Sequence, residues 1–149
     1  MTEVRFYHLQ SQNQKQALPA LLSKALERGH HIVVKLRDAA EVEDMDGHLW
    51  TYSPSSFLPH GSAKSGSKET QPVWLTAEDE NPNKADVLIV GQGAQSEMHG
   101  DFTLCCEIFS GHDPEAVAQA RTRWKAYKEK EFDVTYWQQN ESGGWDKKA

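Results

Sequence analysis

The residue types best suited to chemistry gather near the end of the chain, where an acidic sequence becomes locally basic. The whole chain has a formal net charge of −6. Between residues 121 and 130 only Glu129 is acidic, whereas five residues are basic: Arg121, Arg123, Lys125, Lys128 and Lys130. This local reversal of charge indicates a surface suited to an anionic ligand.

The placement of these side chains around a helix matters more than their number. At about 100° per residue, one side of the predicted helix combines an aliphatic residue, an indole and three cations: Val117, Arg121, Trp124, Lys125 and Lys128. An adjacent side, with Ala116, Ala120 and Tyr127, is predicted to meet the sheet.

This combination suits an extended acidic peptide that carries an apolar or aromatic anchor. Trp124 and Val117 would supply the apolar surface, and the cations would pair with carboxylates. Two alternatives remain open at this point. Spacing alone favours a solvent-exposed helix face with Trp124 half inserted into the core. An indole between cations can also stack on the bases of a single-stranded nucleic acid, although the negative overall charge argues against that ligand.

A second cluster, of aromatic side chains, lies in residues 48–60 (HLWTYSPSSFLPH). It includes Trp50 and Phe57, while Pro54 and Pro59 exclude a long regular element. Aromatic side chains on an irregular segment are either packed on the core or presented to a partner. The composition supports both interpretations equally.

The sequence lacks the patterns that bind cofactors or carry catalysis. No segment matches GxxxxGK followed by Ser or Thr, and Gly91-Gln92-Gly93 lacks the third glycine of a dinucleotide-binding loop. No GxSxG elbow is present for a nucleophilic serine. The adjacent Cys105 and Cys106 lie in an apolar run and are predicted to be core residues. The seven histidines match no metal-ligand spacing, so we expect no catalytic residue, no cofactor and no metal.

An alternation of strands and helices must position these side chains. Strands are predicted at residues 4–9, 31–36, 72–75, 85–90, 103–109 and 132–137. Helices are predicted at residues 17–28 with Pro19 near the first turn, at residues 39–50 after Asp38, and at residues 115–131 after Asp113 and Pro114. This order predicts a three-layer, nucleotide-fold-like α/β domain with a mainly parallel sheet and helices on both faces.

The length of 149 residues fits one domain. We assign residues 1–137 to this domain and expect the polar residues 138–149 to form a loose C-terminal tail. The sequence has no run of about 18 apolar residues, which argues against a membrane span, and its N-terminus shows no signal peptide. The expected compartment is the cytoplasm.

Along nearly its whole length the sequence resembles the chi-subunit family of DNA polymerase III. The resemblance begins with VRFY (residues 4–7) and continues with LW (residues 49–50) and SFLPH (residues 56–60). It also includes DVLI (residues 86–89) and ARTRWKAYKEKEFDV (residues 120–134). No single segment is diagnostic, but the ordered set is specific at this length.

The resemblance implies a domain that binds no nucleotide and has no catalytic activity of its own. In this family the subunit links the clamp loader to the C-terminal tail of the single-stranded-DNA-binding protein. That tail is acidic and ends in an apolar residue with a free carboxylate. The matching positions here are Arg121, Trp124 and Lys125, with Val117 and Lys128 beside them. Relatives commonly carry Tyr where Trp124 stands, and the position of Val117 can be basic.

A second contact surface of the family corresponds to Trp50 and Phe57. There the family holds the psi subunit, which docks on the clamp loader, or an XPD-like helicase. The resemblance therefore implies protein partners on two surfaces, indirect contact with nucleic acid, and no membrane partner. Direct binding of single-stranded nucleic acid by the last helix is the alternative.

Overall fold

The computed structural model describes residues 2–10, 13–51, 61–62, 71–142 and 144–148, without the side chains of Trp50 and Thr51. The elements follow in the order β1 (Glu3–Leu9), α1 (Gln14–Glu27), β2 (Ile32–Lys35), α2 (Ala39–Thr51), β3 (Gly61–Ser62), β4 (Val73–Thr76), β5 (Val87–Val90), the 3-10 turn η1 (His99–Asp101), β6 (Leu104–Ser110), α3 (Pro114–Glu129), β7 (Asp133–Gln139) and β8 (Trp145–Lys147).

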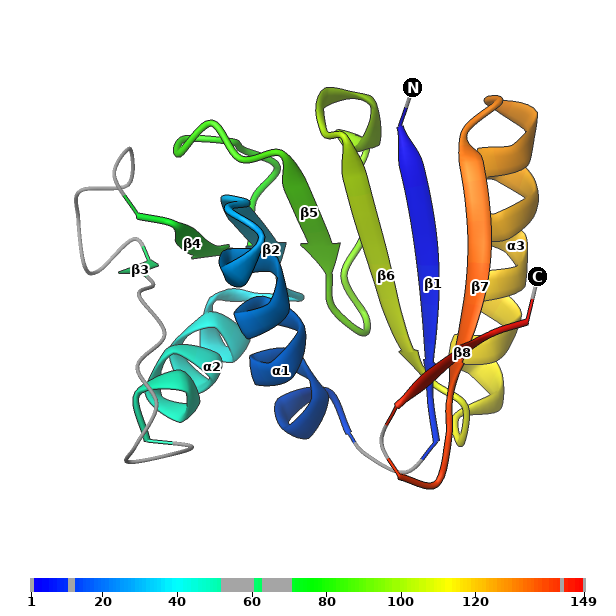
Figure 1. Ribbon diagram of the computed structural model, residues 1–149, viewed down its shortest axis with the longest axis horizontal. Coiled ribbons are helices and arrows are strands. Elements are labelled where there is room, and N and C mark those ends of the chain that lie inside the picture. Colours follow the sequence, from blue (N-terminus) through cyan, green and yellow to red (C-terminus); the bar gives the residue numbers. More distant parts are fainter. Residues whose placement is uncertain (1, 11–12, 52–60, 63–70, 143, 149) are drawn as a thin grey trace.

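The strands form one sheet in the order β3-β4-β2-β5-β6-β1-β7-β8 (Figure 1). All neighbouring strands are parallel except β7 and β8, which are antiparallel. Every residue of β4 and β5 is buried, because parallel strands are covered on both faces. The predicted α/β fold with a mainly parallel sheet is confirmed.

Two apolar clusters, one on each face of the sheet, hold the helices in place. The first contains Leu22 of α1 and Met45 of α2, and the second contains Tyr127 of α3. Strand side chains alternate between the faces, so Tyr7 of β1 joins the first cluster and Phe6 the second. Figure 1 shows α1 and α2 side by side toward one end of the sheet and α3 along β7 at the other.

α1 begins at a capping box, in which the side chains of Asn13 and Gln16 each accept from the other's backbone N–H. Pro19 lies in the second turn of the helix, one turn later than expected. Because Pro19 has no N–H, the carbonyl of Lys15 loses its helical donor. The Nε2 atom of His48 donates to that oxygen at 2.7 Å. A side chain of α2 thus compensates for the proline in α1.

α3 begins where the sequence predicted. The Asp113 side chain caps two backbone N–H groups of the first turn, and Pro114 is the first helical residue. The helix ends at Glu129, before the predicted end at residue 131. Glu131 has a φ of 64°, and a left-handed residue at this point turns the chain out of the helix and into β7.

The prediction of a loose C-terminal tail is wrong. β7 continues to Gln139, and β8 pairs with it in antiparallel register. The Asn140 side chain accepts from backbone N–H groups of the connecting turn. Trp145 packs edge-on against Tyr7, with 4.7 Å between the ring centroids. Asn140 in the turn and Trp145 packed against Tyr7 thus extend the sheet. The polar composition of residues 138–149 did not indicate this strand.

Candidate functional site

α3 covers β1, β6 and β7 incompletely and leaves a hollow of about 380 Å³, which we call the α3 pocket. Its lining consists of Phe6 and His8 of β1, Phe109 of β6, Val117, Ala120, Arg121 and Trp124 of α3, and Tyr136 of β7. Three of the five side chains predicted to bind a ligand therefore meet in one cavity: Val117, Arg121 and Trp124.

Simple periodicities bring these residues together. Positions 117, 120, 121 and 124 follow the i, i+3, i+4, i+7 spacing of one helix face. Phe6 and His8 point to one face of β1 because strand side chains alternate. The sheet register then places Tyr136 beside Phe6 and Phe109 beside His8. These strand residues were not among the predicted site residues, although the alternation in β1 marks Phe6 and His8 as neighbours on one face.

Aromatic rings form the apolar floor of the α3 pocket. The ring centroid of Phe6 lies 5.6 Å from that of Trp124 and 6.5 Å from that of Phe109. The Nζ atom of Lys128 stands 4.9 Å from the centroid of Trp124, within range of a cation–π interaction. Trp124 is therefore half buried and held from two directions, with part of its surface left for an apolar ligand.

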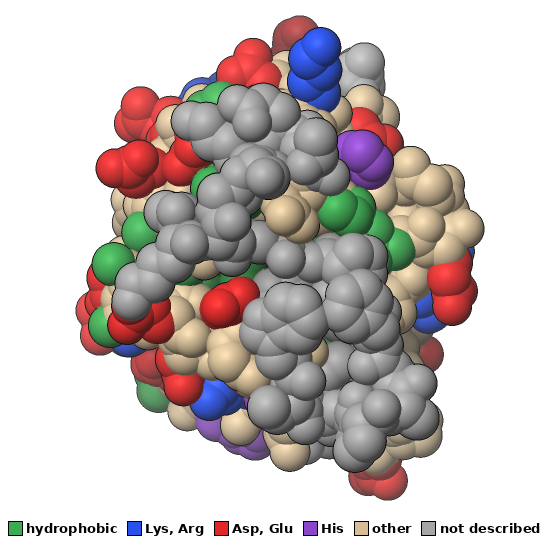
Figure 2. Space-filling model, turned by 90° about the vertical axis from the view of Figure 1, so that its left-hand side faces the viewer, with side chains coloured by type: hydrophobic (Ala, Val, Ile, Leu, Met, Phe, Trp, Pro, Cys, Tyr) green, Lys and Arg blue, Asp and Glu red, His purple; other side chains and the backbone are tan. Residues whose placement is uncertain are grey.

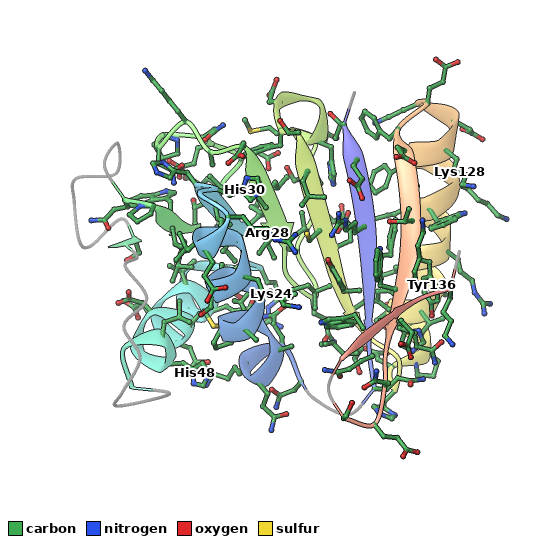
Figure 3. The ribbon with its side chains drawn as sticks, in the orientation of Figure 1. Lys24, Arg28, His30, His48, Lys128 and Tyr136 are labelled. Carbon is green, nitrogen blue, oxygen red and sulfur yellow. The ribbon has the colours of Figure 1, made fainter. Side chains whose placement is uncertain are left out.

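The three predicted cations differ in their positions relative to the pocket. Arg121 is exposed and lines it, Lys125 is exposed outside the lining, and Lys128 lies over Trp124. Figure 3 shows Lys128 and Tyr136 at the α3 end of the molecule, away from α1 and α2. Within the described residues none of the three cations forms an ion pair with a carboxylate. No carboxylate of this described part of the chain therefore competes with an anionic ligand for these charges.

A histidine and a tyrosine form the polar edge of the pocket. The Nδ1 atom of His8 is hydrogen-bonded to the Tyr136 hydroxyl. Burial, with the nearby His112, lowers the pKa of His8 below its usual 6.5. Burial raises the pKa of Tyr136, although the charge of Arg121 opposes this rise. At neutral pH the edge is therefore uncharged apart from Arg121.

A buried carboxylate fixes α3 to the sheet beneath this site. Glu107 of β6 is 1% exposed, and its Oε1 accepts a hydrogen bond of 2.5 Å from the Tyr127 hydroxyl. The same oxygen lies 3.5 Å from Nε of Arg123 and 3.3 Å from Nε2 of His99. Arg123, one of the five basic residues in the segment, thus neutralises a buried charge. This contact and the apolar packing of Ala120 and Tyr127 hold the same face of α3 against the sheet.

A side chain of the protein itself occupies the loop that resembles a phosphate-binding turn. The Oε1 atom of Gln14 accepts from the N–H of Gln92 at 2.6 Å. A Cβ atom added at Gly91 would lie 2.8 Å from the same oxygen. Gly91 is therefore needed so that Gln14 can approach, and Gln14 takes the donor that a phosphate loop would offer. This supports the interpretation of the segment as a turn.

The two cysteines are buried, as predicted. Burial raises the pKa of Cys106 to about 12 and also raises that of Cys105, so neither thiol is activated as a nucleophile. Across the described ranges, no group of three or more His, Cys, Asp or Glu side chains is placed to hold a metal ion. Among the helices described, none has both the length and the apolar character needed to cross a bilayer.

Negative charge is spread widely over the molecule. Figure 2 shows carboxylates scattered over the side of the molecule that carries α2, β3 and β4, where few cations are visible among the described residues. Exposed carboxylates on this side include Glu43, Asp44 and Glu78. Exposed carboxylates also border α3, among them Glu115, Glu129 and Glu131, so its cations form a local basic cluster on an otherwise acidic surface.

The second predicted contact surface cannot be placed side chain by side chain. Trp50 belongs to α2, but its side chain lies outside the described residues, and Phe57 lies outside them entirely.

Comparison with known proteins supplies the family. Residues 1–135 match the model of the family "DNA polymerase III chi subunit, HolC". The chain belongs to this chi-subunit family. A DNA polymerase III subunit chi of Pseudomonas aeruginosa is 26% identical over 137 residues, which cover 90% of this chain and 94% of the relative. A chi subunit of Escherichia coli is 25% identical over 107 residues, covering 71% of this chain and 72% of the relative.

A probable DNA polymerase III subunit chi of Rickettsia prowazekii is 32% identical over 90 residues. That alignment covers 60% of this chain and about half, 54%, of the relative's length. The family name places this chain among the accessory subunits of the bacterial replicative polymerase and thus in DNA replication.

Proposed function

We propose that this chi-family chain is a non-catalytic subunit that binds the acidic C-terminal tail of the single-stranded-DNA-binding protein in the α3 pocket. It thereby links that protein to the clamp loader or to a helicase. The observation that carries the proposal is an apolar hollow whose rim holds the exposed guanidinium of Arg121, which forms no ion pair with any carboxylate among the described residues.

The two parts of the pocket match the two features of such a tail. The terminal apolar side chain packs against the apolar part of the lining, to which Phe6, Val117 and Trp124 belong. The free carboxylate meets Arg121, whose guanidinium can donate two parallel hydrogen bonds to it. Lys125 and Lys128 attract the acidic residues that precede the end of the tail.

The expected affinity is moderate. A buried apolar anchor contributes about 1.5–3 kcal/mol, and each exposed ion pair contributes roughly 0–1 kcal/mol. These gains, together with the hydrogen bonds to the guanidinium and after the cost of ordering the tail, correspond to a dissociation constant near micromolar. Added salt weakens binding, because exposed charges are screened.

We also propose that Trp50 and Phe57 dock the psi subunit or an XPD-like helicase. Membership in the chi family supports this assignment, and α2, which carries Trp50, lies at the other end of the sheet from α3 (Figure 1). Both partners can then bind at the same time. In pull-down assays, Trp50→Ala and Phe57→Ala are expected to lose psi or the helicase and to retain the tail; the reverse pattern exchanges the two sites.

Isothermal titration calorimetry tests the tail site. The probe is a short acidic peptide that ends in Phe with a free carboxylate. We expect Arg121→Glu, Lys125→Glu and Trp124→Ala to weaken binding, and amidation of the peptide's end to weaken it as well. Lys130→Glu makes the same charge change outside the pocket and serves as the matched control. Unchanged affinity in all three site variants removes the assignment.

The alternative ligand for α3 is single-stranded nucleic acid. Titration with oligonucleotides in the absence of any other protein distinguishes this ligand from the acidic tail. Submicromolar binding at physiological salt that is lost in Arg121→Glu favours direct recognition of nucleic acid over recognition of an acidic tail.

A further inference from the structure

A second groove lies on the opposite face of the sheet from the α3 pocket. There α1 forms one wall, and Trp137 of β7 and Trp145 of β8 form the other. We call this hollow of about 250 Å³ the α1 groove. It depends on β8, because Trp145 holds its place through the edge-on contact with Tyr7 on the floor.

The inside of the α1 groove is largely apolar, although the Arg5 guanidinium also lines it and lies 5.5 Å from the ring centroid of Trp137. Leu21 and Ala25 face it from α1, and Cys106 lies on its floor. Both indoles of the opposite wall, Trp137 and Trp145, remain partly exposed. Surface of this kind is costly to leave in water and favours an apolar side chain as occupant.

Two exposed cations border the groove on the α1 side. Lys24 and Arg28 are exposed and, within the described residues, neither forms an ion pair. Figure 3 shows them one after the other beside α1, on its side toward β5. Other basic groups here are already engaged: Arg5 is bound to Glu3, and His30 to Asp86.

The position of these cations near the end of α1 also stabilises the helix, since cations are favourable at a helix C-terminus. Stabilisation of the helix alone does not account for the apolar groove beside these cations. Exposed cations on one side and aromatic surface on the other give the groove two distinct sides.

We propose that the α1 groove docks an extended acidic peptide, with one row of side chains against Lys24 and Arg28 and the other row against Trp137 and Trp145. Residues four apart on a helix are separated by about 6 Å along its axis. Alternate side chains of an extended chain are separated by roughly 6.6 Å. Two carboxylates at alternate positions of the peptide therefore reach the two cations together.

The lining favours a peptide over a nucleic acid. Apart from the cations, it consists mainly of aliphatic and aromatic side chains and offers few polar groups to read a base edge. The chain's net charge of −6 also repels a long polyphosphate more strongly than a short peptide. Because the groove and the α3 pocket lie on opposite faces, the two sites can be occupied at once.

The test uses the full chain and a synthetic peptide of alternating Asp and Leu, acetylated and amidated so that it has no free terminal carboxylate. Binding is followed by fluorescence anisotropy of a dye on the peptide. We expect saturable binding that is about tenfold weaker in the Lys24→Glu/Arg28→Glu double variant, because two exposed ion pairs become repulsive. Lys130→Glu is the control and is expected to retain binding, and Arg121→Glu identifies any binding that takes place in the α3 pocket instead.

Amide chemical shifts supply a second readout that does not depend on charge. Addition of the peptide is expected to move signals of α1 and β8 and to leave those of α3 unchanged. Shifts confined to α3, or loss of binding in Arg121→Glu alone, overturn the proposal because the peptide then occupies the α3 pocket. Absence of binding overturns it as well.

Two further results also reject the acidic peptide as occupant. The first is binding of oligodeoxythymidine that the double variant abolishes. The second is a dimer of the free chain, seen by sedimentation, that the same variant dissociates.

Discussion

Arg121→Ala and Lys125→Ala remove the same charge from the same helix, yet we expect very different losses of affinity for the acidic tail. Arg121 lines the apolar pocket, where hydrogen bonds to a carboxylate are partly shielded from water. A hydrogen bond to a charged group contributes about 1.5–3 kcal/mol, which corresponds to roughly a 10- to 150-fold loss. Lys125 is exposed outside the lining, and an exposed pair worth about 0–1 kcal/mol gives at most about a fivefold loss.

Calorimetry with the tail peptide at low and high salt measures both effects. The small loss in Lys125→Ala is expected to disappear at high salt, because it comes from a screened charge. The loss in Arg121→Ala is expected to persist, and Arg121→Lys should recover only part of it, since lysine cannot form the two parallel hydrogen bonds. Thermal melts check that each variant is folded. Equal losses at the two positions would refute the reasoning, because the ligand would then lie along the outside of α3.

Two other predictions concern proton binding and the anchoring of α3. The pKa of His8 lies below 6.5 in the free protein, and a bound carboxylate raises it, so tail affinity should increase as the pH falls below about 6.5. In calorimetry at a series of pH values, His8→Gln should flatten this pH dependence of the affinity. An unchanged slope contradicts the role of His8. Tyr127→Phe removes the donor to the buried Glu107 carboxylate, which should lower the free energy of unfolding by about 1–3 kcal/mol. Denaturant unfolding measures this loss, and Tyr136→Phe, at a half-buried tyrosine, is the control. An equal loss of stability in the control argues against a special contribution of the buried contact.

Local patterns in the sequence were sufficient to predict most of the fold. Apolar strands separated by helical periodicity gave the α/β architecture, and Asp113 with Pro114 marked the start of α3. The same periodicity placed Ala120 and Tyr127 against the sheet and Arg121 outside. These features depend on spacing within one segment, which a single sequence records directly.

Features that depend on contacts between distant segments were not predictable in this way. Nothing near Gln138 in the sequence indicates that β8 will form, because its stability depends on Trp145 reaching Tyr7 at the other end of the chain. The role of Gln14 at the Gly91 loop also depends on a contact between separate segments.

The candidate site likewise combines features set by local spacing with features set by contacts between distant segments. The sequence determined that Val117, Arg121 and Trp124 share one side of a helix, since that follows from the geometry of the helix alone. Only the tertiary structure decided that this side borders a hollow, because the floor comes from Phe6 and Phe109 on two other strands. The order of the strands brings β1 and β6 together beneath α3, and that order is not recorded in the spacing of any one segment.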